Sequence, residues 1–177
     1  MYVALIRALN VGTKNRLAMA DLAAAFESEG CADVRTYVQS GNVVFDPPAG
    51  GVASLAAGIS ARLLAEHGVD VATVLRSGSE MTAVTAANPF LARGEDPAAL
   101  HVVFLADAPE PGRGGGLDPD RSAPDELAID GREIYLCLPS GMGRTKLTGA
   151  YLERSLGVVG TARNWRTVRA LAEMAGG

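Results

Sequence analysis

Several features that define whole classes of protein are scarce in this chain of 177 residues. It has two cysteines, Cys31 and Cys137, which are too few for a disulfide framework and too far apart for a CxxC metal clip. It has two histidines, His67 and His101, and no second histidine or acid is spaced to join either one. The sequence therefore predicts no metal site, no Ser-His-Asp relay and no cofactor.

Long hydrophobic runs and an excess of positive charge are also missing. The chain contains no run of 18 apolar residues, and it begins with a strand-like pattern instead of the apolar segment of a signal peptide. We therefore expect a cytoplasmic protein that does not enter a membrane. The formal net charge of −4 argues against non-specific binding of duplex DNA, which requires a basic surface. It does not argue against a small basic pocket.

The composition that is present belongs to an ordinary folded protein. Hydrophobic residues make up 48% of the chain and charged residues 20%, which is typical of globular domains and not of disordered segments. A chain of this length forms one domain or two small subdomains, and it buries roughly 70% of the surface of its unfolded state. Such a core is stable without a metal or a disulfide.

The first half of the chain has the pattern of a βαββαβ unit. Leu22 and Phe26 lie four residues apart, on one face of a helix, and Val34, Thr36 and Val38 alternate with polar neighbours as in a half-buried strand. The expected elements are a strand at 2–9, a helix at 20–29, strands at 34–39 and 43–45, a helix at 52–67 and a strand at 69–75. This order is typical of the ferredoxin-like fold.

The second half repeats this order, with one helix weak or lost. Ser77 and Glu80 form a capping-box signature for a connecting helix, and Asp130-Gly131 favours the tight turn of a hairpin. The segment 109–124 is rich in Gly, Pro and Asp, which predicts a loop or a short degraded helix. The other expected elements are strands at 101–105, 127–129, 134–138 and 158–161, a helix at 146–156, and a final helix capped by Asn164.

We therefore expect an α+β protein made of two tandem ferredoxin-like βαββαβ subdomains with antiparallel sheets and a C-terminal helix. The expected boundaries are 1–76 for the first subdomain, 77–98 for a connecting helix and loop, and 99–177 for the second subdomain with its C-terminal helix.

Polar loops at the strand ends supply the candidate binding residues. The first loop, from Arg7 to Asn15, joins a strand to a helix and also carries Asn10 and Lys14; such a loop can present cations and backbone N–H groups to an anion. The hairpin Gln39-Ser40-Gly41-Asn42 should lie beside it, because the first and second strands of this topology run in the same direction. Taken singly, these amides more often satisfy loop backbone groups. Arg7 is equally suited to an ion pair with Asp33 or Glu29.

A second group of candidates follows later strands. The loop from Pro139 to Lys146 contains Gly141, Gly143 and Arg144 and leads toward a helix, without the GxxxxGK[ST] pattern of a P-loop. Arg163-Asn164 should lie at the same edge of its sheet. The alternatives are that Lys14, Arg144 and Lys146 are solvated surface charges and that Arg163 braces the last helix. We hypothesise that both clusters face one cleft.

The residues in these loops resemble a bacterial family catalogued as domain of unknown function 1697. The matching segments are 6–12 with Lys14-Asn15, 36–45, Asn88-Pro89-Phe90, Lys146-Leu147 and 161–168. The resemblance implies a duplicated ferredoxin-like fold and no known activity, substrate or cofactor. Two departures are Ala8 and Thr13, where the family more often has Gly. Thr13 argues against a positive φ at that position.

These observations predict a binding module for a small phosphorylated or carboxylated ligand, for example a nucleotide or an RNA end. One alternative is an enzyme acting on such a ligand, with Arg7, Lys14, Arg144 and Lys146 stabilising charge in a transition state. The other is a protein-interaction adaptor without a small ligand. The sequence does not indicate an oligomeric state.

Overall fold

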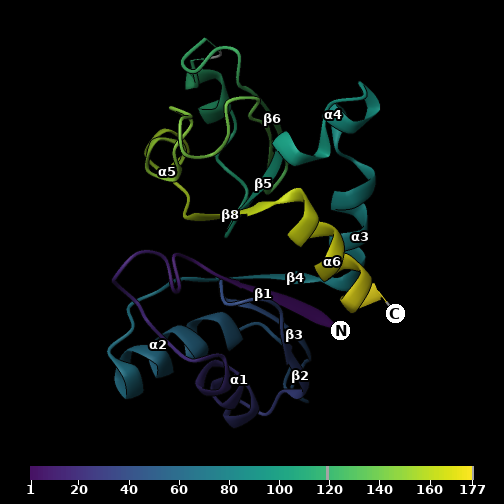
Figure 1. Ribbon diagram of the computed structural model, residues 1–177. Helices are drawn as coiled ribbons and strands as arrows, with labels where there is room; N and C mark the ends of the chain where they lie inside the picture. The colour runs from purple at the N-terminus through teal and green to yellow at the C-terminus, as the bar shows by residue number, and fades with distance from the viewer. Residues whose placement is uncertain (119, 177) are drawn as a thin grey trace. The chain divides into compact units, whose positions relative to one another are not determined.

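The computed structural model describes residues 1–118 and 120–176 (Figure 1). It contains two four-stranded antiparallel sheets with the strand orders β2-β3-β1-β4 and β6-β7-β5-β8. Each sheet has its own helices, and a helix ends the chain. The predicted α+β architecture of tandem ferredoxin-like units is therefore confirmed, since the two halves share one strand order.

The chain divides into two compact units. The first comprises Met1–Ala83 together with the end of the chain from Ala170, and the second comprises Val84–Arg169. The boundaries expected from the sequence at 76 and 99 stay predictions.

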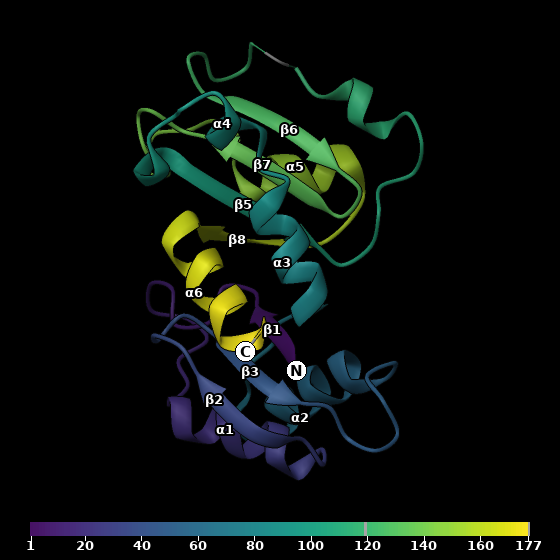
Figure 2. The same cartoon turned by 90° about the vertical axis from the view of Figure 1, so that its right-hand side faces the viewer.

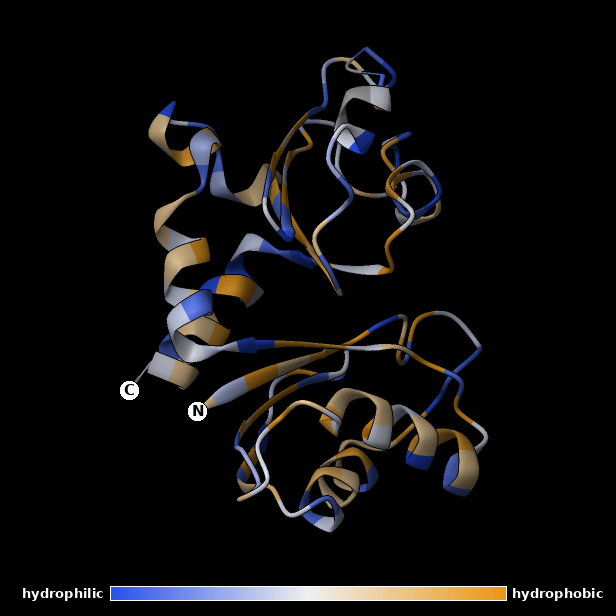
Figure 3. Ribbon diagram, turned by 180° about the vertical axis from the view of Figure 1, so that it is seen from behind, coloured by the Kyte–Doolittle hydropathy of each residue, from blue (hydrophilic) through white to orange (hydrophobic). Residues whose placement is uncertain are grey.

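The first unit packs two helices on one face of its sheet (Figure 1). Its elements are β1 (Tyr2–Ile6), α1 (Met19–Ser28), β2 (Ala32–Thr36), β3 (Asn42–Asp46), α2 (Leu55–His67), β4 (Thr73–Ser77) and the start of α3 (Gly78–Ala86). Phe26 of α1 and Ile59 of α2 meet Ala4, Ile6 and Phe45 of the sheet in one apolar core. Hydrophobic residues run along these strands and helices in Figure 3.

The second unit has less helical cover (Figure 2). Its elements are α4 (Pro89–Ala92), the 3-10 turn η1 (Pro97–Ala99), β5 (Leu100–Leu105), the 3-10 turn η2 (Arg113–Gly116), β6 (Glu126–Asp130), β7 (Glu133–Cys137), α5 (Gly149–Leu156), β8 (Gly160–Asn164) and the start of α6 (Trp165–Gly176). Between β5 and β6 the described residues form η2 where the first unit has α1, which confirms the predicted loss of one helix. Residue 119, within the predicted 109–124 loop, lies outside the described residues, as does residue 177.

The duplication extends to individual hydrogen bonds. In the first unit the Ile6 N–H donates to the Gly41 carbonyl and the Arg7 N–H to the Ala72 carbonyl, each at 2.8 Å. In the second unit Leu105 donates to Arg132 and Ala106 to Val159, also at 2.8 Å. Both pairs lie where the first strand of a unit ends, so the same strand end is built twice.

The caps agree with the sequence in both units. The Glu80 N–H donates to the Ser77 hydroxyl while the Ser77 N–H donates to the Glu80 carboxylate, which completes the predicted capping box. The Thr167 N–H donates to Asn164 Oδ1 at 2.8 Å, which confirms Asn164 as the cap of α6. The hairpin turn is shifted by one residue: Asp130 pairs with Glu133, so its central residues are Gly131 and Arg132, with φ of 57° at Gly131.

Two strands and one helix begin later than the sequence predicts. The strand predicted at 69–75 is β4 at Thr73–Ser77, and the one predicted at 158–161 is β8 at Gly160–Asn164. Each contains a buried arginine, Arg76 or Arg163, which a polarity pattern places outside a strand. The helix predicted at 146–156 begins at Gly149, with Thr148 as its cap.

Candidate functional site

The first loop is a tight structure with repeated left-handed backbone. Ala8, Asn10, Gly12 and Asn15 have φ of 54°, 56°, 67° and 51°. Such values are rare for residues other than Gly, and Asn tolerates them better than Ala does. Ala8 therefore occupies a conformation that suits the Gly expected there from the family resemblance. Thr13 is not among the residues with positive φ.

The side chain of Asn10 holds this loop to its neighbours. Its Nδ2 donates to the Leu17 carbonyl at 2.9 Å and to the Gln39 carbonyl at 3.0 Å, and its Oδ1 accepts the Leu17 N–H at 2.9 Å. The bond to Gln39 confirms that the first loop and the β2–β3 hairpin lie side by side. Asn15 Nδ2 donates to the Asp70 carbonyl at 3.4 Å, which places the exit of α2 nearby.

The other candidates of the first unit divide into structural and exposed groups. Asn42 is fully buried, and its Nδ2 donates to the Tyr37 carbonyl and to the Ser40 hydroxyl, each at 3.0 Å. Gln39 and Lys14 have exposed side chains, and Arg7 is partly buried. Both acids considered as partners of Arg7 have another partner, since Arg62 contacts Glu29 and Arg35 contacts Asp33. Ligand binding by this group stays a prediction.

In the second unit the structure brings Arg144 and Lys146 together at a polar pocket. The pocket has a volume of about 250 Å³. Its lining consists of Asp120, Arg121, Ser122, Ala123, Asp125, Ser140, Arg144 and Lys146. We call this site the polar pocket. Two of the eleven predicted site residues line it, and the sequence analysis did not select the others as ligand contacts.

Hydrogen bonds join the two loops that form the polar pocket. The Lys146 N–H donates to the Ser122 hydroxyl at 2.8 Å, and Arg121 Nε donates to the Lys146 carbonyl at 3.1 Å. The Arg121 guanidinium also lies 3.9 Å above the centre of the Tyr151 ring, a cation–π contact. These bonds explain why α5 starts at Gly149: residues 145 and 146 bond across the loops and do not extend the helix.

The cations of the polar pocket differ from other arginines of the protein in their surroundings. Arg62 pairs with Glu29 and Glu66, and Arg93 pairs with Glu95 and Glu126. Arg121, Arg144 and Lys146 form no ion pair with any carboxylate in the described parts of the chain. The polar pocket therefore holds three cations and two carboxylates, Asp120 and Asp125, which leaves a small excess of positive charge, although acids outnumber bases in the sequence by 20 to 16.

Arg163 and Asn164 are not among the lining residues of the polar pocket. The strand pairing places the last residues of β7 and β8 at the same end of the sheet, as predicted. Cys137 pairs with Leu100 and Asn164 pairs with His101, and both partners lie at the start of β5. Arg163, however, belongs to β8, and its Nη1 donates to Thr161 Oγ1 at 2.7 Å and to the Ala162 carbonyl at 2.8 Å. Burial lowers the pKa of Arg163 to about 10, so it stays charged at neutral pH.

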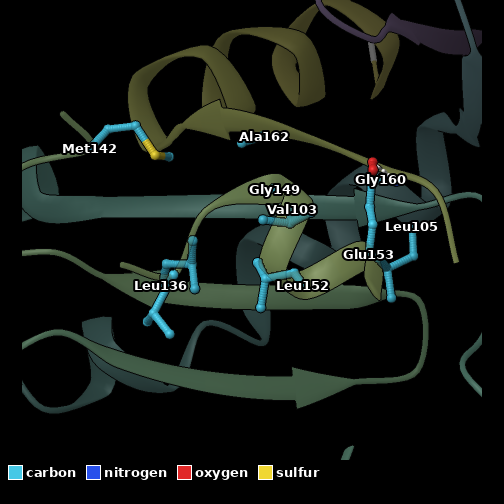
Figure 4. A pocket seen from close by; sticks show the side chains of 10 residues that line it. Val103, Leu105, Leu136, Met142, Gly149, Leu152, Glu153, Gly160 and Ala162 are labelled. Carbon is cyan, nitrogen blue, oxygen red and sulfur yellow. Dashed lines mark hydrogen bonds between the residues drawn. The ribbon is translucent and has the colours of Figure 1, made fainter. Parts of the chain in front are cut away.

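A second hollow in this unit is apolar and small (Figure 4). Val103 and Leu105 of β5, Leu152 of α5 and Gly160 of β8 are among its lining residues. Glu153 closes one side, where its carboxylate accepts the Gly160 N–H at 3.1 Å. The volume of about 30 Å³ is comparable to that of one water molecule. A hollow of this size has room for about one water-sized group.

Burial shapes the chemistry of the two cysteines and of His101. Burial raises the pKa of both the Cys31 and the Cys137 thiol, which makes them poor nucleophiles. Burial lowers the pKa of His101, and this effect outweighs the bond from its Nδ1–H to the Ala99 carbonyl. In residues 1–118 and 120–176, no group of three or more His, Cys, Asp or Glu side chains is arranged to hold a metal ion.

Sequence reasoning missed Arg121, Ser122 and Asp125 because they lie within, or directly after, the 109–124 segment, which is predicted as an irregular loop. Its Gly, Pro and Asp content predicts the absence of regular structure but not the surface against which the segment packs. Arg121 was the available signal, as a cation with Asp118, Asp120, Ser122 and Asp125 within four positions.

Comparison with known proteins places the chain in a family. The model of a family described as protein of unknown function (DUF1697) matches residues 1–135. The chain belongs to this family. The DUF1697 match includes the first loop, the β2–β3 hairpin and five lining residues of the polar pocket: Asp120, Arg121, Ser122, Ala123 and Asp125. No curated protein matches the chain.

A solved structure extends the comparison of this DUF1697 protein to nearly its whole length. The conserved bacterial protein SP0830 from Streptococcus pneumoniae aligns with 98% of this chain and 97% of its own, with a TM-score of 0.71 and 22% sequence identity. At this identity the likeness shows the shared fold alone. Within the described residues, none of the helices is both long and apolar enough to cross a membrane.

Proposed function

We propose that this protein binds a small ligand through a phosphate or carboxylate group, in the polar pocket of its second unit. The observation that carries the proposal is the convergence of Arg121, Arg144 and Lys146 on one hollow, where none of them forms an ion pair with a carboxylate of the described residues. Arginine presents a planar fork of donors that matches the geometry of an oxyanion, and lysine adds a compact charge.

The construction of the pocket supports binding by preorganisation. Arg121 is held by the Lys146 carbonyl and by the Tyr151 ring, so less conformational freedom is lost when it meets a ligand. Ser122 is held by bonds to Lys146 and Asp125. Ser140, at the pocket wall, offers a further hydroxyl to a ligand oxygen.

The size of the pocket limits the ligand. Its volume of about 250 Å³ lies just below the roughly 300–1,000 Å³ that is typical of pockets for drug-sized molecules. A compact body with one anionic group fits this volume better than a whole nucleotide does. Among the ligands that the sequence suggests, the pocket therefore favours a small phosphorylated or carboxylated metabolite.

The test is a binding titration with inorganic phosphate, ethyl phosphate and acetate at constant ionic strength, by calorimetry and by thermal shift. A ligand present at about 100 times its Kd stabilises a protein by about 2.7 kcal/mol. For a chain of this size, that shift corresponds to roughly 5–10 °C in Tm. We expect at least one of the phosphates to produce a shift of this kind.

The matched variants are Arg144→Ala and Arg154→Ala. Both remove one exposed arginine of the second unit, but Arg154 lies in α5 outside the pocket lining. A charge-assisted hydrogen bond contributes about 1.5–3 kcal/mol, so Arg144→Ala should weaken binding roughly tenfold or more. Arg154→Ala should leave the affinity unchanged. Equal affinities of the two variants, or no binding by the wild type, would refute the proposed function.

The first loop carries a separate and weaker proposal. Arg7, Lys14 and Arg16 are three cations in a stretch without acids, which begins at the end of β1 and reaches Asp21. Beside this stretch lies the exposed Gln39. We propose that these side chains form an additional anion contact. Lys14→Ala in the same titration tests it, since a loss of phosphate affinity is expected only if the first loop takes part.

A further inference from the structure

A buried carboxylate lines the polar pocket among its cations. Asp125 is 4% exposed, and its Oδ2 accepts the Ser122 hydroxyl at 2.7 Å. The backbone also holds it in place, because the Asp125 N–H donates to the Ser122 carbonyl at 2.8 Å. Its second oxygen, Oδ1, has no hydrogen-bond partner among the described residues.

An unpartnered buried carboxylate oxygen is costly, because the group has lost water without gaining a donor. Native structures satisfy nearly all such atoms, so each exception calls for a physical reason. A carboxylate beside Arg144 and Lys146 also weakens the attraction of the pocket for a plain anion. Both costs fall if a ligand brings its own donor to the Asp125 carboxylate.

We propose that the ligand of the polar pocket carries an O–H or N–H donor beside its anionic group, and that this donor binds the Asp125 carboxylate. The inference rests on the proposed function. The anionic group binds Arg121, Arg144 and Lys146, and the donor forms a hydrogen bond with the carboxylate of Asp125. The ligand class is therefore a hydroxyalkyl or aminoalkyl phosphate or carboxylate, such as a sugar phosphate or an amino acid derivative.

Three ligands of one size test this reading: ethyl phosphate, 2-hydroxyethyl phosphate and 2-aminoethyl phosphate. They differ only in the terminal group, which is a methyl, a hydroxyl or an ammonium. We expect at least one of the two donor-bearing ligands to bind the wild-type protein about tenfold more tightly than ethyl phosphate. In Asp125→Ala this preference should disappear, whereas the affinity for ethyl phosphate should persist or rise.

The outcomes separate this inference from the proposed function. If all three ligands bind equally and Arg144→Ala weakens all three, the pocket binds anions but the role of Asp125 is refuted. The same role is refuted if Asp125→Ala keeps the wild-type preference. If none of the three binds, the proposed function itself fails. The wild-type series requires no variant, and Asp125→Asn provides a second test that keeps the shape of the side chain.

Discussion

The left-handed backbone at Ala8 leads to a prediction whose sign follows from one dihedral angle. Ala8 is exposed and has φ of 54°, so its methyl group contributes little packing while its Cβ crowds the following carbonyl. We predict that Ala8→Gly stabilises the protein, although a Gly substitution ordinarily destabilises a folded chain.

The magnitude is the difference of two opposing effects. A left-handed residue other than Gly costs about 1–2 kcal/mol, and Gly relieves this cost. The extra freedom that Gly gives to the unfolded chain costs about 0.4–1 kcal/mol. The net gain is about 0.8 kcal/mol, which corresponds to roughly 2–3 °C in Tm for a chain of this size.

Two glycines in open space serve as matched controls. A Cβ at Gly12 or at Gly50 would meet no atom within 4 Å, but Gly12 has φ of +67° and Gly50 lies outside the left-handed region. Gly12→Ala should therefore destabilise and Gly50→Ala should stabilise, each by somewhat less than about 1 kcal/mol. Urea denaturation followed by circular dichroism measures all three. A loss of stability in Ala8→Gly, or shifts of one sign in both controls, would contradict the reasoning.

Two further predictions concern turn packing and pH. Gly41→Ala should destabilise by about 2–4 kcal/mol, because Gly41 has φ of +70° and a Cβ there would lie 2.8 Å from the Ile6 Cβ; a fall in Tm no larger than that of Gly12→Ala would show that the turn relaxes. Burial lowers the pKa of His101 in the folded state, so the unfolded state binds the proton more readily. The free energy of unfolding should therefore carry no His101 penalty above about pH 6.5, and it should decrease as the pH falls below that value. Denaturation at pH 5.5 and 7.5 should show this decrease in the wild type and a smaller one in His101→Phe, and equal slopes would contradict it.

The sequence predicted the fold well where local rules and burial agree. The capping box at Ser77 and the cap at Asn164 formed as expected, and so did the βαββαβ order. The two misplaced strands have a common cause, since Arg76 and Arg163 lie buried inside β4 and β8. Each donates from Nη1 to the carbonyl of the residue before it. A polarity pattern assigns such residues to loops, because it cannot show that the guanidinium has a hydrogen-bond acceptor within its own strand.

The candidate site was predictable only in part, and for a different reason. Arg144 and Lys146 lie in a Gly-containing loop whose composition indicated anion binding. Arg121 and Asp125 come from an irregular segment, and nothing in its sequence specifies contacts across 20 or more residues. The burial of Asp125 depends on how this segment packs, so its role could be inferred only after the loops were seen together.

The two halves of the duplication differ in what covers one face of the sheet. The first half has α1 there, and the second has η2 and an irregular segment. A helix keeps its backbone amides for itself and offers a sheet a stripe of apolar side chains. The irregular segment lacks that cover and instead places Arg121, Ser122 and Asp125 at the polar pocket. The first copy of the repeat thus retains α1, whose apolar side chains pack on the sheet and stabilise the fold. The other copy lacks this helix, so substitutions in its irregular segment can alter the pocket lining while both sheets stay intact.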